Sequence, residues 1–347
     1  MLYNPNSSIF IKKLSFAFGT YGVEIFFVLS GFLIGKILIN LFQKDDFKSH
    51  IKNFYIRRWF RTLPLYYLIF LINIIILIST HPNINISQLF YIKYLFFIQN
   101  FDLRHYDFFS QSWSLSIEEW FYLLMPVVLL VFHFKKIQSK NLYKNLIKII
   151  FLIIAIRFGY VLQCNPGIDA GLRTYIPVRL DSILIGVVFA CLKINNQEIY
   201  NKILSKKYII INLILLVLTT LYLFYCFAYN NNPSIFGLLS FKIFFWSFLS
   251  FSFGAFIVFI ENNEFINKKL TNFSLIKVFF EKTSLYSYSI YLLHVIILNY
   301  YFNHTNLFNN TKYLFLATLI SLSTIYILSA LTYKLIEKPI MDLRDKF

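Results

Sequence analysis

Apolar runs long enough to cross a bilayer recur along the whole chain, and they limit its fold more than any other feature. Hydrophobic residues make up 58% of the 347 residues, whereas about 45–50% is usual in soluble globular domains. A run of about 20 apolar residues crosses the hydrocarbon core as one α-helix. The sequence therefore predicts an all-α polytopic membrane protein. No polar stretch is long enough to fold as a separate soluble domain.

We expect about nine transmembrane helices plus one re-entrant or interfacial segment. The predicted spans are Tyr21–Leu41, Leu63–Ser79, Ser114–Phe134, Leu146–Cys164, Val178–Leu192, Tyr208–Ala228, Phe236–Ile260, Ser284–Phe302 and Tyr313–Ile336. The segment Gln88–Asn100 is too short for a good span, so we expect it to re-enter the membrane or to lie at its surface.

Lysine and arginine gather in alternate loops, and this pattern explains the net charge of +17. The basic loops are residues 44–61, 135–144, 202–207 and 268–282, and the loops between them are nearly uncharged. An excess of Lys and Arg marks the cytoplasmic side of a membrane protein. The C-terminus is therefore expected in the cytoplasm and Met1 outside, and no nucleic acid partner is expected. The three cysteines show no metal spacing, so no metal site is predicted.

Arg57-Arg-Trp-Phe-Arg61 stands where the chain is expected to enter the bilayer from the cytoplasm. Arg58 and Arg61 are three residues apart, so they share one face of a helix. Two guanidinium groups on one face suit a phosphate group. Simple anchoring of the helix at the inner surface is the other interpretation of the same residues.

Trp113-Ser-Leu-Ser-Ile-Glu-Glu-Trp-Phe-Tyr122 places Glu118 and Glu119 at the expected outer end of a span. A carboxylate at membrane depth is costly, which makes it a candidate for function. Glu118 and Tyr122 share a helix face because they are four residues apart. A glutamate in contact with water near the headgroups is the alternative.

Taken in order, the motifs resemble the acyltransferase-3 family of integral membrane O-acyltransferases. The matching pieces are Gly22–Ile34, the Arg-x-x-Arg of Arg58 and Arg61, Trp113–Tyr122 with Pro126, Arg179–Gly186, Ser287–His294 and Glu337–Pro339. Each piece is weak alone, but six in the family's order make a specific resemblance over nearly the whole chain from Gly22 onward. Glu24 stands where the family usually has Asp, and this difference keeps the charge.

The resemblance implies transfer of an acyl group, usually acetyl, from acyl-CoA to a hydroxyl of a cell-surface polysaccharide or lipid-linked glycan. It implies a multi-pass protein of the bacterial cytoplasmic (inner) membrane. The expected donor substrate is acetyl-CoA or another acyl-CoA, and no cofactor is expected to be bound permanently. The glycan acceptor and membrane lipid are the other expected partners.

The family also has ten spans, and its first helix carries a basic residue followed about three turns later by a histidine taken as catalytic. Residues 1–21 contain no histidine and no apolar run of spanning length, so we expect that helix to be missing. The expected division is an extracytoplasmic N-terminal remnant at residues 1–20, a membrane acyltransferase domain at residues 21–341, and a cytoplasmic tail at residues 342–347.

The resemblance and the predicted topology suggest roles for nine residues. Arg57, Arg58 and Arg61 would hold the phosphates of acyl-CoA. Glu118 and His294 are the catalytic candidates, because Glu118 could orient a base and His294 alone among six histidines lies near mid-span. The residues proposed to bind substrate are Glu24, Arg157, Arg179 and Asp181.

A charge inside the membrane is costly without a partner. Arg157 should therefore pair with Glu118, Glu24 or Asp181. Structural pairing and acceptor binding both remain open for these charged residues. A lone histidine on an apolar helix, such as His294, is also commonly a structural, hydrogen-bonded residue.

Two other functions remain open. The chain could be a catalytically inactive remnant that lacks the first helix, or a transporter or flippase of a lipid-linked sugar. Only 10 glycines and 8 prolines are present, and no internal repeat is visible, whereas secondary transporters commonly have broken helices and inverted repeats. The sequence therefore favours the acyltransferase.

Overall fold

The structure, a computed structural model, describes residues 9–44, 46–82, 88–101, 108–229, 239–263, 274–305 and 313–344. Twelve α-helices and several short helical turns make up this part of the chain, and it contains no strand. The helices are α1 (Ile9–Phe42), α2 (Phe47–Thr80), α3 (Gln88–Leu95), α4 (Ser112–Phe134), α5 (Leu142–Cys164), α6 (Leu180–Asn195), α7 (Gln197–Ile203), α8 (Lys206–Tyr229), α9 (Leu239–Asn262), α11 (Ser274–His304), α12 (Leu314–Thr332) and α13 (Lys338–Arg344).

Several of these helices are long and apolar enough to cross a membrane, which confirms an all-α multi-pass membrane protein. Six helices in the described residues meet this test, or seven if the bent pair α7–α8 is one span. Within the described residues, all nine predicted spans fall mainly on helices. However, α6 has only 16 residues, and α11 does not meet the same test of length and composition. The count of nine therefore stays a prediction.

Helix boundaries differ from the predicted spans mainly where charged residues occur. The first span continues N-terminally as helix to Ile9, through part of the predicted N-terminal remnant. The second begins at Phe47, so the arginine motif lies inside α2 and not before it. Residues 1–8, and residues 345–347 of the predicted tail, lie outside the described residues.

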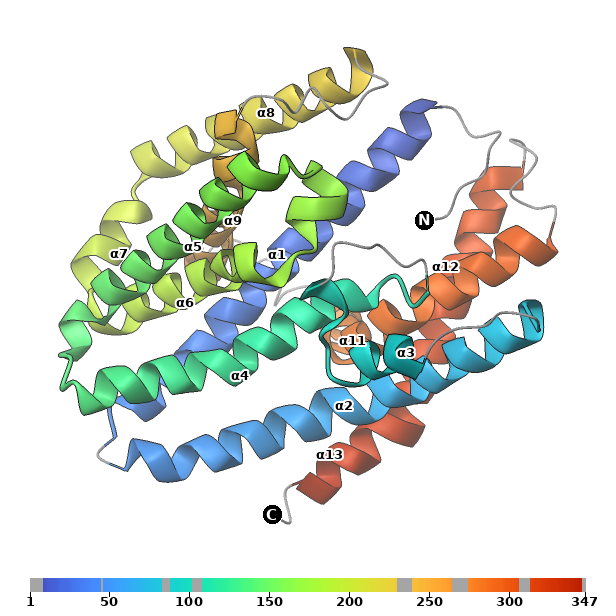
Figure 1. The fold of residues 1–347 in the computed structure, drawn as a ribbon, viewed down its shortest axis with the longest axis horizontal. Helices are drawn as coiled ribbons and strands as arrows, with labels where there is room; N and C mark the ends of the chain where they lie inside the picture. Colours follow the sequence, from blue (N-terminus) through green and yellow to red (C-terminus); the bar gives the residue numbers. More distant parts are fainter. Residues whose placement is uncertain are drawn as a thin grey trace.

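Helix α6 forms the centre of one half of the bundle. Figure 1 shows α5, α6, α8 and α9 on one side of α1, with α2, α3, α11 and α12 on the other. Most side chains of α6 are buried, from Asp181 to Leu192. A Cβ atom added at Gly31 would lie 1.9 Å from the carbonyl oxygen of Ile183, and one at Gly186 would lie 2.1 Å from that of Val28. Small residues let two backbones approach closely in membranes, so these glycines fix α1 against α6.

The other half of the bundle packs around α2. Tyr66 and Phe70 of α2 are buried among rings that include Tyr94 and Phe109. The Tyr288 hydroxyl of α11 donates to the carbonyl oxygen of Thr62 at 2.7 Å. After α12, a π-helical turn, Tyr333–Glu337, leads into α13, which contacts α2. Helices far apart in sequence are therefore joined at the level of the arginine motif.

The predicted re-entrant segment begins as α3, whose 8 residues are too few to cross a bilayer. Phe97, with φ of 57°, turns the chain towards α4. Its carbonyl oxygen accepts a 3.0 Å hydrogen bond from the Trp120 indole, and the Asn100 amide donates to the carbonyl oxygen of Trp113 at 2.7 Å. The segment is thus held on the first turns of α4.

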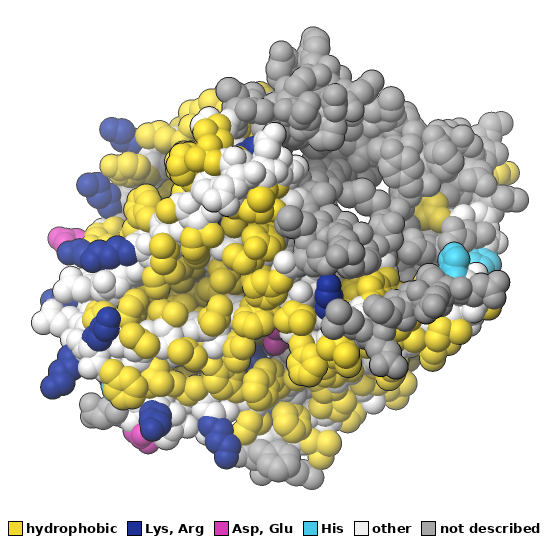
Figure 2. Space-filling model, in the orientation of Figure 1, with side chains coloured by type: hydrophobic (Ala, Val, Ile, Leu, Met, Phe, Trp, Pro, Cys, Tyr) yellow, Lys and Arg dark blue, Asp and Glu magenta, His cyan; other side chains and the backbone are white. Residues whose placement is uncertain are grey.

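Aromatic contacts between Phe42, Phe47 and His133 mark where α1 ends, α2 begins and α4 ends. These ends join the basic loops, so they correspond to the predicted cytoplasmic side. Figure 2 shows hydrophobic side chains over the middle of the visible face and Lys and Arg along one edge. This surface agrees with a membrane-embedded body.

Candidate active site

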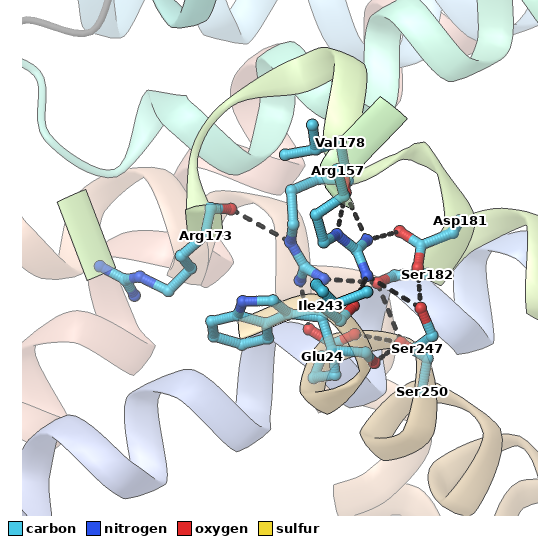
Figure 3. A network of polar contacts seen from close by, with 11 residues as sticks. Glu24, Arg157, Arg173, Val178, Asp181, Ser182, Ile243, Ser247 and Ser250 are labelled. Carbon is cyan, nitrogen blue, oxygen red and sulfur yellow. Dashed lines mark hydrogen bonds and ion pairs between the residues drawn. The ribbon is translucent and has the colours of Figure 1, made fainter. Parts of the chain in front are cut away.

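Two buried ion pairs join α1, α5, α6 and α9, and Figure 3 shows them in one connected network. Arg179 donates to Glu24 at 2.5 Å, and Arg157 donates to Asp181 at 2.6 Å. All four side chains are at most 1% exposed. We call these four residues, together with Ser182, Ser247 and Ser250, the ion-pair network.

Serines and backbone carbonyls complete the hydrogen bonds of these charges. Arg157 donates to the carbonyl oxygens of Val178 at 3.0 Å and Ile243 at 2.8 Å. Ser247 donates to Asp181 at 2.5 Å, and Ser250 donates to Glu24. Buried charges in membranes are tolerated when they are paired and hydrogen-bonded in this way.

Arg157 therefore pairs with Asp181, one of the three partners expected from the sequence, and Arg179 pairs with Glu24. The four residues predicted to bind substrate are thus brought together. Each charge is already neutralised by another member of the set, and the arrangement supports a structural role. Acceptor binding by these residues stays a prediction.

A second buried carboxylate, Glu118, is held differently. Ser30 donates to Glu118 Oε1 at 2.6 Å, and the Tyr122 hydroxyl donates to the same oxygen. The oxygens of Ser30 and Tyr122 are 2.6 Å apart. Glu118 is 6% exposed, and no described residue forms an ion pair with it. We call Ser30, Arg58, Glu118 and Tyr122 the Glu118 cluster.

Arg58 brings positive charge to this cluster without touching the carboxylate. Its guanidinium lies 5.8 Å from the centre of the Tyr122 ring and 5.8 Å from that of Phe54. It is close enough to interact electrostatically with Glu118 and Glu119. A carboxylate with hydroxyl donors and a nearby, unpaired cation can accept a proton and stabilise developing negative charge.

The structure brings Arg58 and Glu118 to one level of the bundle, whereas the sequence placed them at opposite ends of their spans. Arg58 comes 11 residues after Phe47 in α2, and Tyr122 comes 11 residues before His133 in α4. At 1.5 Å per residue the cluster is about 16 Å along the helices from the ends of α2 and α4 that join the basic loops. The sequence had placed Glu118 at the outer end and Arg58 at the inner mouth. The structure puts them at one level because α2 is helical from Phe47.

The other two arginines of the motif lie nearer the surface of α2. Arg57 and Arg61 are exposed, whereas Arg58 is partly buried. Arg61 interacts electrostatically with Glu118 and with Glu337. Glu337 is buried and accepts a hydrogen bond from Ser289 of α11. The motif thus presents cations both to the interior and to the surface.

His294 lies on α11, one turn beyond Tyr291. Its Nδ1 atom is 2.6 Å from the carbonyl oxygen of Tyr291. The Tyr291 hydroxyl contacts Ser114 of α4 and donates to the carbonyl oxygen of Gln111 at 2.8 Å. Within the described residues no hydrogen bond joins His294 to Glu118. The two catalytic candidates are therefore linked only through the packing of α11 on α4.

Sequence reasoning did not identify Ser30 as a site residue. The Ser30-Gly31 step was visible inside an apolar helix, but its meaning depends on packing. Gly31 faces α6 at the close crossing, and Ser30, the next residue round the helix, meets α4. No group of three or more His, Cys, Asp or Glu side chains in the described part of the chain is placed to hold a metal ion.

Comparison with known proteins places the chain among acyltransferases. The sequence model of an acyltransferase domain matches residues 1–333. The chain is 38% identical over 127 residues to the peptidoglycan O-acetyltransferase OatA of Listeria monocytogenes. The aligned region is 33% of this chain and 20% of that protein. It is 30% identical over 193 residues to the O-acetyltransferase OatA of Staphylococcus aureus, covering 50% of this chain and 30% of the relative.

A third relative is the putative peptidoglycan O-acetyltransferase YrhL of Bacillus subtilis, 32% identical over 187 residues, or 50% of this chain and 28% of that protein. The matches thus span less than a third of the relatives' length. No solved structure matches the chain. Because the family model covers nearly the whole chain and the six motifs follow the family's order, the protein belongs to the acyltransferase-3 family of membrane O-acyltransferases.

Proposed function

We propose that the protein moves an acyl group, most simply acetyl, from acyl-CoA to a hydroxyl of a cell-surface glycan. The observation that carries this proposal is the Glu118 cluster, where a buried carboxylate with no ion-pair partner among the described residues faces hydroxyls and a nearby arginine. Charges at membrane depth without a structural partner mark function. The three relatives named above act, by their names, as O-acetyltransferases, two of them on peptidoglycan. Peptidoglycan is therefore the first acceptor to test.

The three arginines differ in exposure, and this difference suggests separate roles: Arg58 is partly buried, whereas Arg57 and Arg61 are exposed. In acyl-CoA the pantetheine arm separates the thioester from the phosphates, so one side chain cannot contact both ends. Arg58, beside Tyr122, would lie at the thioester end and stabilise the charge that develops there. Arg57 and Arg61, exposed on the same helix, would hold the phosphates. Glu118 would accept the proton of the attacking hydroxyl.

The remaining expectations belong to the same proposal. His294 would serve as a second proton carrier on the path from the outer side. The ion-pair network would position α1 and the acceptor side of the bundle. We place the protein in the bacterial cytoplasmic membrane with nine spans and the C-terminus inside, so that acyl-CoA reaches the basic ends and the glycan reaches the opposite face.

The decisive experiment is reconstitution of the purified chain in liposomes with radiolabelled acetyl-CoA and peptidoglycan fragments. Glu118→Gln keeps the size of the side chain but removes the base, so transfer should fall roughly 100- to 10,000-fold with unchanged folded yield. Arg58→Ala should lower the rate, and Arg61→Ala should raise the KM for acetyl-CoA. Lys52→Ala removes an exposed cation from the same helix and should change neither. Full transfer by Glu118→Gln would contradict the assigned base, and no transfer by the wild type with any acyl-CoA or glycan would contradict the function.

A further inference from the structure

Four serine hydroxyls in the described residues donate to a buried carboxylate on another helix, and Ser30 differs from the other three. Ser247 and Ser250 donate to Asp181 and Glu24, whose charges are already taken by arginines in the ion-pair network. Ser289 donates to Glu337, but Ser289 is 0% exposed, as is Ser250. Ser30 is 9% exposed. Of the two serines whose carboxylate has no ion pair among the described residues, Ser30 and Ser289, it is therefore the one that a substrate can approach.

The partners of Ser30 have the arrangement of an activated nucleophile. Such a group lies within hydrogen-bond reach of a base, and a third residue orients the base. Here Ser30 Oγ is 2.6 Å from Glu118 Oε1. Tyr122 holds the same carboxylate oxygen from one helical turn away. A serine in a membrane helix commonly bonds to a carbonyl of its own preceding turn, whereas Ser30 donates to a carboxylate on another helix.

We propose that Ser30 is acylated during the reaction, so that transfer proceeds through an acyl-enzyme. This inference rests on the proposed function and specifies its route: the donor is an acyl thioester, and the acyl group waits on α1 between the two substrates. An acyl-enzyme on α1 lets the donor leave towards the basic ends of the helices before the acceptor arrives. The two substrates then need not meet.

The two half-reactions balance without any further reactant. In the first, Ser30 gives its proton to Glu118, Ser30 Oγ bonds to the acyl carbon, and the carbon–sulfur bond breaks. The departing CoA thiolate takes the proton from Glu118. In the second, the acceptor hydroxyl gives its proton to Glu118, its oxygen bonds to the acyl carbon, and the ester bond to Ser30 breaks. The proton returns from Glu118 to Ser30.

The close crossing of α1 and α6 holds the nucleophile in place. Gly31 follows Ser30 directly, and a Cβ atom there would meet the backbone of Ile183. Helix α1 cannot shift relative to α6 without changing this contact. A small error in the position of a reacting group lowers the rate by a large factor. The contact of Gly31 with α6 therefore helps to position Ser30.

The test is to mix the purified full-length protein in detergent micelles with radiolabelled acetyl-CoA in the absence of glycan. Wild type should release CoA in an amount stoichiometric with the chain and retain label after denaturation. The label should resist neutral hydroxylamine, as an oxygen ester does, and map to the peptide containing Ser30. Ser30→Ala should lose the label, and Ser30→Cys should carry it as a hydroxylamine-sensitive thioester. Ser289→Ala, the matched serine–glutamate pair, should be labelled like wild type.

Transfer to glycan by wild type without label on Ser30, or full transfer by Ser30→Ala, would overturn the acyl-enzyme and leave the proposed function standing. Absence of transfer by wild type under every donor and acceptor would instead remove the proposed function and this inference with it. Ser30→Cys controls for folding, because it keeps a nucleophile of similar size at the same place.

Discussion

The ion-pair network and the Glu118 cluster both bury carboxylates and arginines inside the bundle, but they treat the charges in opposite ways. In the network each arginine lies 2.5 or 2.6 Å from a carboxylate. In the cluster Arg58 lies over an aromatic ring, and among the described residues the hydrogen-bond donors to the Glu118 side chain are the hydroxyls of Ser30 and Tyr122. Neutralised charges serve a scaffold, whereas a charge left without an opposite charge is available for chemistry. Burial of a charge alone therefore does not identify a candidate active site. Glu337 also has no ion pair within the described residues, and the partial exposure of Ser30 distinguishes the Glu118 cluster from it.

Arg157→Met tests the scaffold side of this comparison and should have the largest effect. It leaves Asp181 buried without its partner, which costs about 3–5 kcal/mol. Little folded protein should be recovered from membranes, as measured by size-exclusion chromatography in detergent. The double variant Arg157→Met, Asp181→Leu removes both charges and should recover much of the folded yield. A single variant as stable as wild type would show that the pair is not structural.

Gly186→Ala should have an intermediate effect on stability. It tests whether the packing of α1 against α6 also controls the Glu118 cluster. The added methyl group would lie 2.1 Å from the carbonyl oxygen of Val28, so α1 must shift away from α6. Overpacking of this kind costs about 1–3 kcal/mol, and the shift should also lower acyl transfer by moving Ser30. Gly159→Ala is the control, because a Cβ atom there meets nothing within 4 Å. Thermal unfolding and transfer rates measured together would show whether the position of α1 matters for catalysis; equal values for both variants would contradict it.

Lys193→Met should have the smallest effect on stability. It tests whether burial, and not only a short distance, determines how much an ion pair stabilises the protein. Lys193 lies 2.9 Å from Glu261, and Lys36 lies 2.5 Å from the same carboxylate. These distances resemble those in the network, but the side chains are about 30% exposed. Exposed pairs contribute at most about 1 kcal/mol, so the thermal stability should hardly change. A loss as large as that of Arg157→Met would mean that distance, and not burial, decides the value of these pairs.

Much of the fold follows from the sequence because length and apolar composition determine which segments can cross a bilayer. Every predicted span falls on a helix, and the segment after α2 is short, as expected. Helix α6 has 16 residues, most of them apolar, and only the packing shows that protein surrounds it. Boundaries were least accurate beside charges, because a hydropathy pattern ends where arginines begin although the helix continues.

The site was less predictable than the fold for the same physical reason. The motifs identified Arg58 and Glu118. The high free energy of an unpaired charge inside a membrane suggested that Arg157 has a carboxylate partner. Which of three carboxylates it meets depends on how α5 and α6 face each other, and no local pattern carries that information. No sequence pattern identified Ser30, because a serine within an apolar helix is common. Its contact with Glu118 becomes visible only when the packing of α1 against α4 is known.

The setting of α6 also bears on how the protein tolerates different bilayers. At 1.5 Å per residue α6 is about 24 Å long, shorter than a hydrocarbon core of about 30 Å. Its side chains are covered by α1, α5 and α9, so lipid tails do not have to match its length. Thickness changes would be felt first by the outward-facing residues of α5 and α8, such as Phe151 and Leu218, through tilting of those helices. Acyl chain length in the surrounding lipid should therefore alter the outer helices before it disturbs the helices that hold the ion-pair network.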